Sequence, residues 1–339
     1  MKKSIVALAV LTASGASFAQ SNVTIYGIAD IWFGTASVSG QESQTVLQSG
    51  GVSGSRWGLK GSEDLGGGLK ANFQLENSFS LDTGTDTTGF TRQAYVGVSG
   101  GFGEVKLGNV YTAYDDISGA ANAAFDSALA PVNGVTLPNG TATSVWLSTG
   151  YTSNPTNNIY YALPDFNGFT GAVSYALGEN KTATLGASNV LSMNVQYAAG
   201  PMYVGFGYQN ETPQGGGTSP TFTRLNGTYD LGAAKMLVGY GRVSDKNNAG
   251  VTTAGAQTTE WELGVDVPVS AALTVSAGYA RSSDNVLAGD ATRTGYAVAA
   301  AYSLSKRTTA YAGLHSDTTS VAGADTTGRI VALGLKHTF

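Results

Sequence analysis

The chain has 339 residues, a formal net charge of −5 and only 12% charged residues, against roughly 25% in an average soluble domain. It contains no cysteine, so disulfides cannot hold its fold together. The low charge argues against an ordinary soluble surface. The acidic balance argues against nucleic acid as a partner, because neutralising phosphates requires a basic surface.

The first segment, residues 1–19, has the pattern of a secretory signal peptide. Lys2 and Lys3 precede a short apolar run, which gives way to small residues ending at Ala19. The alternative, an N-terminal membrane anchor, is disfavoured because the run is well short of the roughly 20 residues that a spanning helix needs. We therefore expect cleavage after Ala19, export, and one mature domain over residues 20–339.

From residue 22 onward the chain alternates apolar and polar residues over about ten positions and then stops at Gly, Asn, Asp or Pro, which is typical of strands and turns. In one such segment Phe169, Val173 and Tyr175 point one way, whereas Thr170 and Ser174 point the other. About sixteen segments of this kind are predicted, near 22–33, 55–63, 69–81, 91–100, 103–108, 158–163, 169–177, 191–198, 202–210, 221–230, 235–243, 257–267, 273–282, 293–303, 308–315 and 329–339.

The connections between these segments alternate between short turns and long loops, and the longest loop lies near 109–157. This alternation is typical of an outer-membrane barrel, whereas a soluble β-sandwich, the alternative, would not sort its loops in this way. A sheet in lipid must close, because each unpaired backbone group costs several kcal/mol there. The expected fold is all-β, an antiparallel transmembrane β-barrel of about sixteen strands, and a barrel of that size leaves an aqueous channel.

Four stretches of the sequence resemble the general Gram-negative porins of β-proteobacteria and Neisseria: SNVTIYGIADIWF, SRWGLKGSEDLGGGLKANFQLE, TRQAYVGVSGGFGEVKLGN and the terminal GRIVALGLKHTF. The resemblance covers the mature chain and is strongest over 55–109 and in the last strand. It implies a homotrimer in which each barrel has its own pore, narrowed by a third outer loop folded into the lumen.

The same resemblance implies residence in the cell outer membrane, among lipid and lipopolysaccharide. It also implies that the barrel-assembly machinery reads the terminal Phe339 as part of an assembly signal. From the alternation alone, Phe339 shares the apolar face with Leu333 and Leu335, so a packing role is served equally.

The residues expected to line the pore fall into two groups of opposite charge. The longest loop carries acids but no Lys or Arg. A loop of this length is usually functional, although solvated surface acids are the alternative. By strand alternation, the bases of the neighbouring strands point into the lumen, where a basic wall facing an acidic loop would orient dipolar solutes. The loop acids are Asp115, Asp116 and Asp126, and the wall bases are Arg56, Lys60, Lys70 and Lys106.

Arg92 is ambiguous at this stage. The family pattern makes it a wall arginine, whereas alternation places it with Ala94 and Val96 on the lipid face; a bulge, or a position at the outer end of the strand, would reconcile the two. Relatives often carry a further arginine before the sixth strand, and this chain has no base over residues 151–158. We therefore hypothesise a weakly selective pore, with the wall bases set against the loop acids and against Glu260, Glu262 and Asp266.

Two rival functions can be weighed from the same residues. Catalysis is disfavoured, because the only histidines are His337, on the apolar face of the last strand, and His315, where the fifteenth strand meets a loop. An adhesin or a substrate-specific channel is also disfavoured, because the loops 211–220 and 244–256 have no aromatic track for sugars and no basic cluster for phosphate. The sequence predicts a porin for passive diffusion of ions and small hydrophilic solutes, with no enzyme activity, cofactor, metal or nucleic-acid partner.

Overall fold

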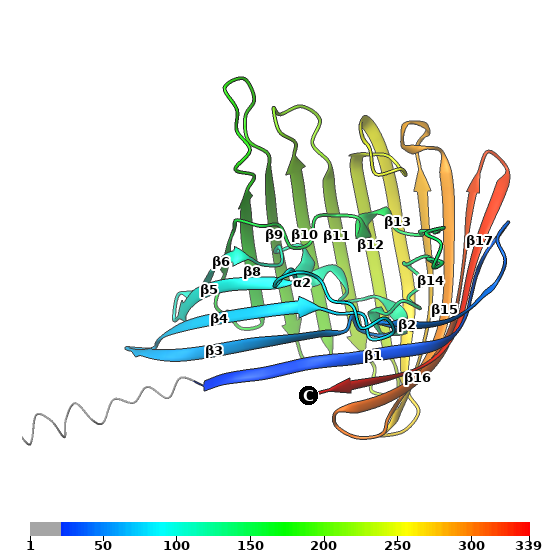
Figure 1. Ribbon diagram of the computed structural model, residues 1–339, viewed down its shortest axis with the longest axis horizontal. Coiled ribbons are helices and arrows are strands. Elements are labelled where there is room, and N and C mark those ends of the chain that lie inside the picture. The colour runs from blue at the N-terminus through cyan, green and yellow to red at the C-terminus, as the bar shows by residue number, and fades with distance from the viewer. Residues whose placement is uncertain (1–21) are drawn as a thin grey trace, which may run out of the picture.

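The structure, a computed structural model, describes residues 22–339, and the predicted signal peptide, residues 1–19, lies outside that range. The described residues form one antiparallel sheet that closes on itself (Figure 1). The strands are β1 (Asn22–Val38), β2 (Gln44–Ser49), β3 (Arg56–Gly66), β4 (Leu69–Ser78), β5 (Gln93–Gly100), β6 (Gly103–Asn109), β7 (Asn158–Ala162), β8 (Phe169–Leu177), β9 (Asn189–Ala199), β10 (Met202–Thr212), β11 (Thr221–Asp230), β12 (Lys235–Lys246), β13 (Thr252–Pro268), β14 (Leu273–Asp284), β15 (Ala291–Ser303), β16 (Thr308–Val321) and β17 (Ala324–Thr338).

The ring has sixteen positions, although seventeen strands are present in the described range, because β2 and β3 share one position. β2 pairs with residues 31–36 of β1, and β3 pairs with residues 22–28 of the same strand. The predicted 16-stranded antiparallel barrel is therefore confirmed. β2 was not predicted, because its residues fell inside what the sequence presented as a loop over 34–54.

The break between β2 and β3 is organised by the buried side chain of Asp30. Its carboxylate accepts the backbone N–H groups of Gly51, Val52 and Ser53 at 3.0, 3.1 and 2.9 Å. It also accepts the hydroxyl of Tyr311, on β16, at 2.5 Å. One carboxylate thus satisfies three consecutive donors that the interrupted strand would otherwise leave without partners.

The ring closes where the last residue meets the first strand. The backbone groups of Phe339 and Gly27 exchange hydrogen bonds of 3.0 and 3.1 Å. The Phe339 ring covers Gly27, where an added Cβ would come within 2.3 Å of it. A glycine is needed here because the terminal aromatic ring occupies the place of a side chain.

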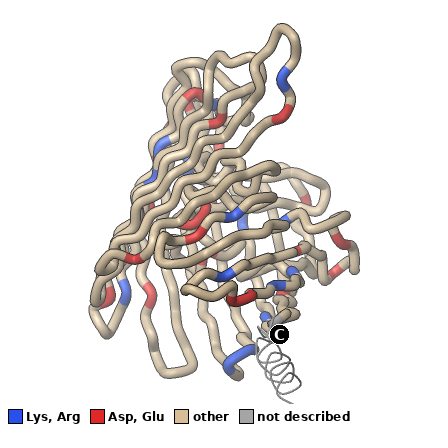
Figure 2. The backbone as a smooth tube through the Cα atoms, turned by 90° about the vertical axis from the view of Figure 1, so that its left-hand side faces the viewer, with Lys and Arg blue, Asp and Glu red and all other residues tan. Residues whose placement is uncertain are grey.

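Strand alternation separates two faces of the barrel. The outer face exposes large apolar side chains along the strands, such as Phe33, Val96, Leu263 and Leu333. This is the surface that a membrane barrel presents to lipid. Figure 2 shows how sparse the charged residues are along the strands. No helix within residues 22–339 is long and apolar enough to cross a membrane.

The wall is uneven in height. β4 to β7 have 10, 8, 7 and 5 residues, whereas β13 to β17 have between 12 and 17. The β16–β17 hairpin is longer than the sequence predicts. A loop is predicted over 316–328, but residues 316–321 continue β16 and pair with β17. The Thr- and Ser-rich composition of this stretch indicated a loop. Within 316–321 only Asp317 is buried, so polar residues suffice for a strand there.

Candidate functional site

Residues 110–157, between β6 and β7, are called the long loop below; in Figure 1 its α2 helix (Asp115–Ser118) is drawn between the front strands and the back wall. The loop is bonded to inward-facing side chains of the wall. Ser192 Oγ on β9 accepts the N–H of Tyr114 at 2.7 Å, and Asn194 Nδ2 donates to the Ala113 carbonyl at 2.6 Å. Both wall side chains are buried, so the loop lies directly on this part of the wall.

Arg224, on β11, joins the two limbs of the long loop. Its guanidinium donates to the carbonyl of Ser118 on the outgoing limb and, at 2.9 Å, to Ser148 Oγ on the returning limb. It also lies over the rings of Tyr114 and Trp146, 5.9 and 4.9 Å from their centroids, an arrangement that stabilises a desolvated cation. Only 1% of Arg224 is exposed. Alternation could have shown that it points inward, but not what would cover it.

Two acids of β13 hold the same loop. Glu260 accepts the N–H groups of Leu147 and Ser148, and Glu262 accepts the N–H of Ala123 at 2.8 Å. Both carboxylates have no exposed surface. The hypothesis that Glu260 and Glu262 act as open lumenal charges is therefore wrong: they point inward as alternation requires, but the loop lies over them.

The far end of the long loop reaches β14 and β16. The N–H of Ala124, in the turn labelled α3 (Ala123–Asp126), donates to Ser276 Oγ at 2.7 Å. Thr143 donates to Asp317 at 2.9 Å. Apolar loop residues such as Leu129 pack in one cluster with Trp32 of β1. At the near end, Ser174 Oγ on β8 accepts the N–H of Ala113 at 3.2 Å. The loop is thus anchored along the wall from β8 round to β1.

His315 does not lie where the sequence predicts it, at the end of a strand. The sequence placed it where a strand meets a loop, but β16 continues past it and the side chain is buried, with Nε2 3.1 Å from Asp317 Oδ1. It lies behind the anchored loop. His337 is exposed on the outer face with Leu333 and Leu335, as predicted.

The basic residues lie on the other half of the ring, over β3 to β6. The strand registers align Thr24, Lys60, Gln74 and Tyr95 in one row across β1, β3, β4 and β5. Arg56 and Lys70 share the inward face of their strands with Lys60 and Gln74, and Lys106 lies beside Tyr160 of β7. This half is called the basic wall below.

Glu76, which the sequence analysis did not single out, is the centre of the basic wall. Its carboxylate accepts Arg92 Nε at 2.6 Å and Tyr26 OH at 2.8 Å, and it lies 3.7 Å from Arg56 Nε. Alternation could have found it, because Glu76 falls on the same face of its strand as Lys70. Assigning Arg92 to the lipid face by alternation is wrong: it precedes the first residue of β5, so the parity of that strand does not apply to it.

Lower on the basic wall, Lys106 is held by one acid and two aromatic rings. Its Nζ is 3.3 Å from Glu104 Oε2 and lies 5.3 and 5.0 Å from the ring centroids of Tyr95 and Tyr160. Lys60 lies 5.0 Å from the ring centroid of Tyr26. Lys70 is exposed near the short turn that ends β3.

Tyrosine side chains bind two of the loop acids. Tyr160 OH donates to Asp116 Oδ2 at 2.7 Å, and Lys106 Nζ lies over the ring of the same tyrosine. Desolvation between the loop and the wall raises the pKa of Asp116 to about 6, although the hydrogen bonds favour its ionised form. Tyr151 OH donates to Asp115 at 2.5 Å, and desolvation raises the pKa of Asp115 as well.

Asp126 lies apart from this contact. Asn122 Nδ2 donates to its carboxylate at 2.6 Å, within the same turn of the loop, and burial raises the pKa of Asp126. The structure therefore brings Asp115 and Asp116 towards the basic wall, but it does not bring Asp126 there.

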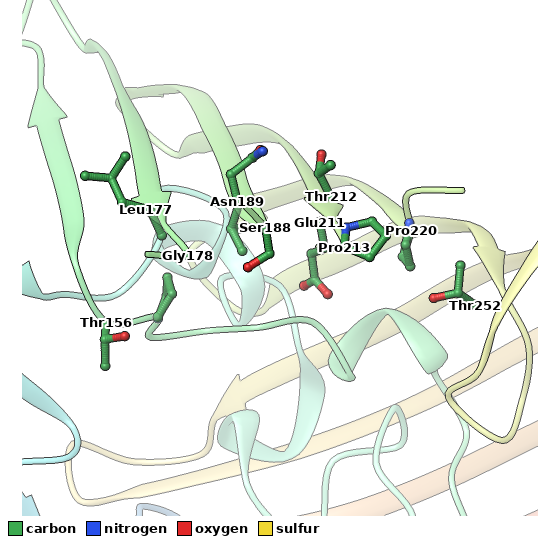
Figure 3. Close-up of a pocket in the computed structure, with 13 residues that line it drawn as sticks. Thr156, Leu177, Gly178, Ser188, Asn189, Glu211, Thr212, Pro213, Pro220 and Thr252 are labelled. Atoms are coloured by element: carbon green, nitrogen blue, oxygen red, sulfur yellow. The ribbon is translucent and has the colours of Figure 1, made fainter. Parts of the chain in front are cut away.

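A cleft of about 390 Å³ lies beside the returning limb of the long loop, at one end of β8 to β10 (Figure 3). Leu177, Asn189 and Thr212 line it together with Glu211. The Glu211 carboxylate accepts the N–H of Thr152 at 2.6 Å and Gln209 Nε2 at 2.9 Å. Its acid is thus engaged in holding the returning limb of the long loop.

A closed barrel of sixteen positions, apolar outside and polar inside, defines a membrane channel. The model of the family described as Gram-negative porin matches residues 6–322. The chain belongs to that family and is an outer-membrane channel for passive diffusion of small solutes. Membership indicates a channel rather than an enzyme.

Individual relatives agree with this assignment. Outer membrane porin protein 32 of Delftia acidovorans is 32% identical over 370 residues, covering 100% of both chains. An outer membrane porin protein of Bordetella pertussis is 26% identical, also over the full length of both. Among solved structures, an anion-selective porin from Comamonas acidovorans superposes with a TM-score of 0.76 at 26% identity, covering 94% of this chain and 100% of that one.

Proposed function

We propose that the long loop narrows this channel and that solutes pass between the loop and the basic wall. One observation carries the proposal: the loop is anchored to buried side chains of β8 to β16, and the basic wall on β3 to β6 is left facing it. Asp116 and Lys106, which both contact Tyr160, mark where loop and wall approach each other. Charges of both signs then border the path of the solute.

We propose a weak preference for anions. Lys70 and its register partner Asp64, near the short turn, cancel each other. The rest of the wall carries four bases around two acids, Glu76 and Glu104, so its charge is 4 − 2 = +2. The four bases are Arg56, Lys60, Arg92 and Lys106. The acids of α2 lie opposite and partly offset this charge. A relative described as anion-selective supports the sign of the preference.

Reversal potentials across a KCl gradient in planar bilayers test this proposal. The wild-type channel should show a small anion preference. Glu76→Gln should increase it about threefold, because two arginines lose their shared carboxylate. The matched control is Glu42→Gln, an exposed acid in the turn between β1 and β2. A strong cation preference of the wild type, or an unchanged potential in Glu76→Gln, would contradict the proposal.

We propose that the protein assembles as a homotrimer through its low wall. The short strands β4 to β7 expose apolar residues such as Val96, Leu107 and Ile159. A trimer form of OmpT from Vibrio cholerae shares the fold, with a TM-score of 0.66 and 15% identity. Native mass spectrometry of the detergent-extracted protein should give three copies, and a monomer would contradict the proposal.

We also propose the export route predicted from the sequence. Residues 1–19 would be removed as a signal peptide, and the barrel-assembly machinery would read Phe339 before inserting the chain among outer-membrane lipid and lipopolysaccharide. Phe339 pairing with Gly27 at the closing seam supports an early role for this residue. Intact-mass analysis of the mature protein should place its N-terminus at Gln20.

A further inference from the structure

The basic wall contains a cleft of about 430 Å³, next to the group that Glu76 forms with Arg56 and Arg92. Inward-facing side chains of β1 and β3 to β6 line it, and the volume suits a small organic solute. The polar lining residues are Thr24, Lys60, Ser62, Asn72, Gln74, Tyr95 and Glu104. The cleft opens beside the path proposed for solutes.

Lys60 brings an uncompensated positive charge to this cleft. Arg56, Arg92 and Lys106 each have a carboxylate within ion-pair distance. Within residues 22–339, no carboxylate lies at that distance from Lys60, whose ammonium lies over the ring of Tyr26. An ammonium held on an aromatic ring keeps its remaining donors available to a solute.

Glu104 brings a negative charge that is only loosely engaged. One of its oxygens is 3.3 Å from Lys106 Nζ, and the other accepts a long 3.4 Å bond from Asn72. Its side chain is 28% exposed. A carboxylate has about four acceptor positions, so Glu104 retains capacity for a further donor.

We propose that this cleft is a subsite for small polar zwitterions of the α-amino-acid class, with the solute carboxylate at Lys60 and its ammonium at Glu104. The proposal rests on the solute path proposed above. The backbones of β3 and β6 are three strand spacings apart, about 14 Å, but the side chains of Lys60 and Glu104 both reach into the cleft between them, which brings their charged ends closer together. The amides of Asn72 and Gln74, on the strand next to β3, offer hydrogen bonds to the polar remainder of the solute.

Both charges are needed for this selectivity. A solute with only a carboxylate binds Lys60 but leaves the Glu104 carboxylate without an ammonium partner. A solute with only an ammonium binds Glu104 but leaves Lys60 without a carboxylate. A zwitterion satisfies both ends at once. Selectivity therefore has two sources of similar weight. A singly charged solute is repelled by the wall residue of its own charge, and a zwitterion is attracted by both residues.

Brief blockades of single-channel current in planar bilayers at low KCl test the proposal. The probes are L-glutamine, glutaramate, which lacks only the α-ammonium, and neutral glutaramide. In the wild-type channel, glutamine should lengthen the blockades about fivefold relative to either analogue, which corresponds to about 1 kcal/mol. Equal blockades by glutamine and glutaramate would overturn the proposal and reduce the cleft to part of an anion path.

Two variants separate the two contacts. Glu104→Gln should remove the advantage of glutamine and should strengthen blockade by glutaramate, because Lys106 loses its partner acid. Lys60→Met should weaken blockade by both. The matched controls are Glu42→Gln and Lys306→Met, exposed residues of turns remote from the cleft. Retention of the glutamine advantage in Glu104→Gln would also overturn the proposal.

The same bilayers report on the broader function separately. Reversal potentials in KCl alone measure the charge of the basic wall without any zwitterion. If Lys60→Met leaves the reversal potential unchanged, the proposed solute path fails. If the potential shifts and glutamine still behaves like glutaramate, only the subsite fails.

Discussion

The two halves of the barrel lining use the same alternating pattern for different purposes. On β8 to β16, inward side chains such as Arg224 and Glu260 are fully buried and hold the long loop. On β3 to β6, Lys60, Lys106 and Glu104 remain partly exposed and are held mainly by tyrosines and by one another. A charge that points inward thus anchors or lines the channel according to whether the loop lies over it.

This contrast also explains why a charged residue can be buried in a channel. Desolvating an ion is costly unless hydrogen bonds or counter-charges replace its water. Glu260 obtains backbone N–H groups from the loop, and Arg224 obtains a carbonyl, a hydroxyl and two aromatic faces. The loop and the wall therefore stabilise each other, and substitutions that remove their contacts should weaken both.

The largest effect is expected from Arg224→Met. The two limbs of the long loop lose their common donor, and the loss of two charge-assisted hydrogen bonds costs about 3 kcal/mol. Open-channel current should become noisy and the thermal unfolding temperature should fall. Arg224→Lys, which keeps the charge without the planar fork, should restore quiet current only in part.

The control for this change is Arg242→Met, an exposed arginine of the neighbouring strand β12. It should leave both the noise and the unfolding temperature unchanged. If Arg224→Met loses thermal stability but keeps a quiet current, Arg224 supports the fold without positioning the loop.

A smaller effect is expected from Asp30→Asn, on β1, where the barrel lining passes from one half to the other. An asparagine presents one oxygen where three backbone N–H groups and the Tyr311 hydroxyl now bind a carboxylate. We expect a loss of about 2 kcal/mol in the free energy of unfolding, measured by denaturant titration. Tyr311→Phe removes one of the four bonds and should cost less; an equal or larger cost would show that the backbone contacts contribute little.

The sequence was sufficient for the fold because strand alternation is a local signal that lipid enforces. One face of every strand must be apolar and no edge can remain open. The same rule assigned Arg56, Lys60, Lys70 and Lys106 to one face of their strands, and the registers align Lys60 with Gln74 and Lys106 with Tyr160. It failed where a residue lies outside a strand, as Arg92 does, or where polar residues continue a strand, as in 316–321.

The contacts of the long loop were beyond prediction from the sequence. Alternation shows that Glu260 and Lys60 both point inward, but the difference between them depends on which strands the loop covers. That choice is made by contacts between residues more than 100 positions apart, such as Leu147 with Glu260 and Ser118 with Arg224. Nothing in the local pattern of either partner records them.

The smallest expected effect is a pH dependence of ion selectivity that arises from Asp116 on the long loop. The pKa of Asp116 is raised to about 6. The carboxylate is therefore charged above that pH and becomes neutral as the pH falls through it. The loop then loses a negative charge beside Lys106, and the anion preference should rise between pH 7.5 and pH 5, by about half in the permeability ratio. Reversal potentials over this range measure it. Asp116→Asn should show the low-pH value throughout, whereas a wild-type potential that stays flat from pH 7.5 to pH 5 would place Asp116 outside the path of the ions.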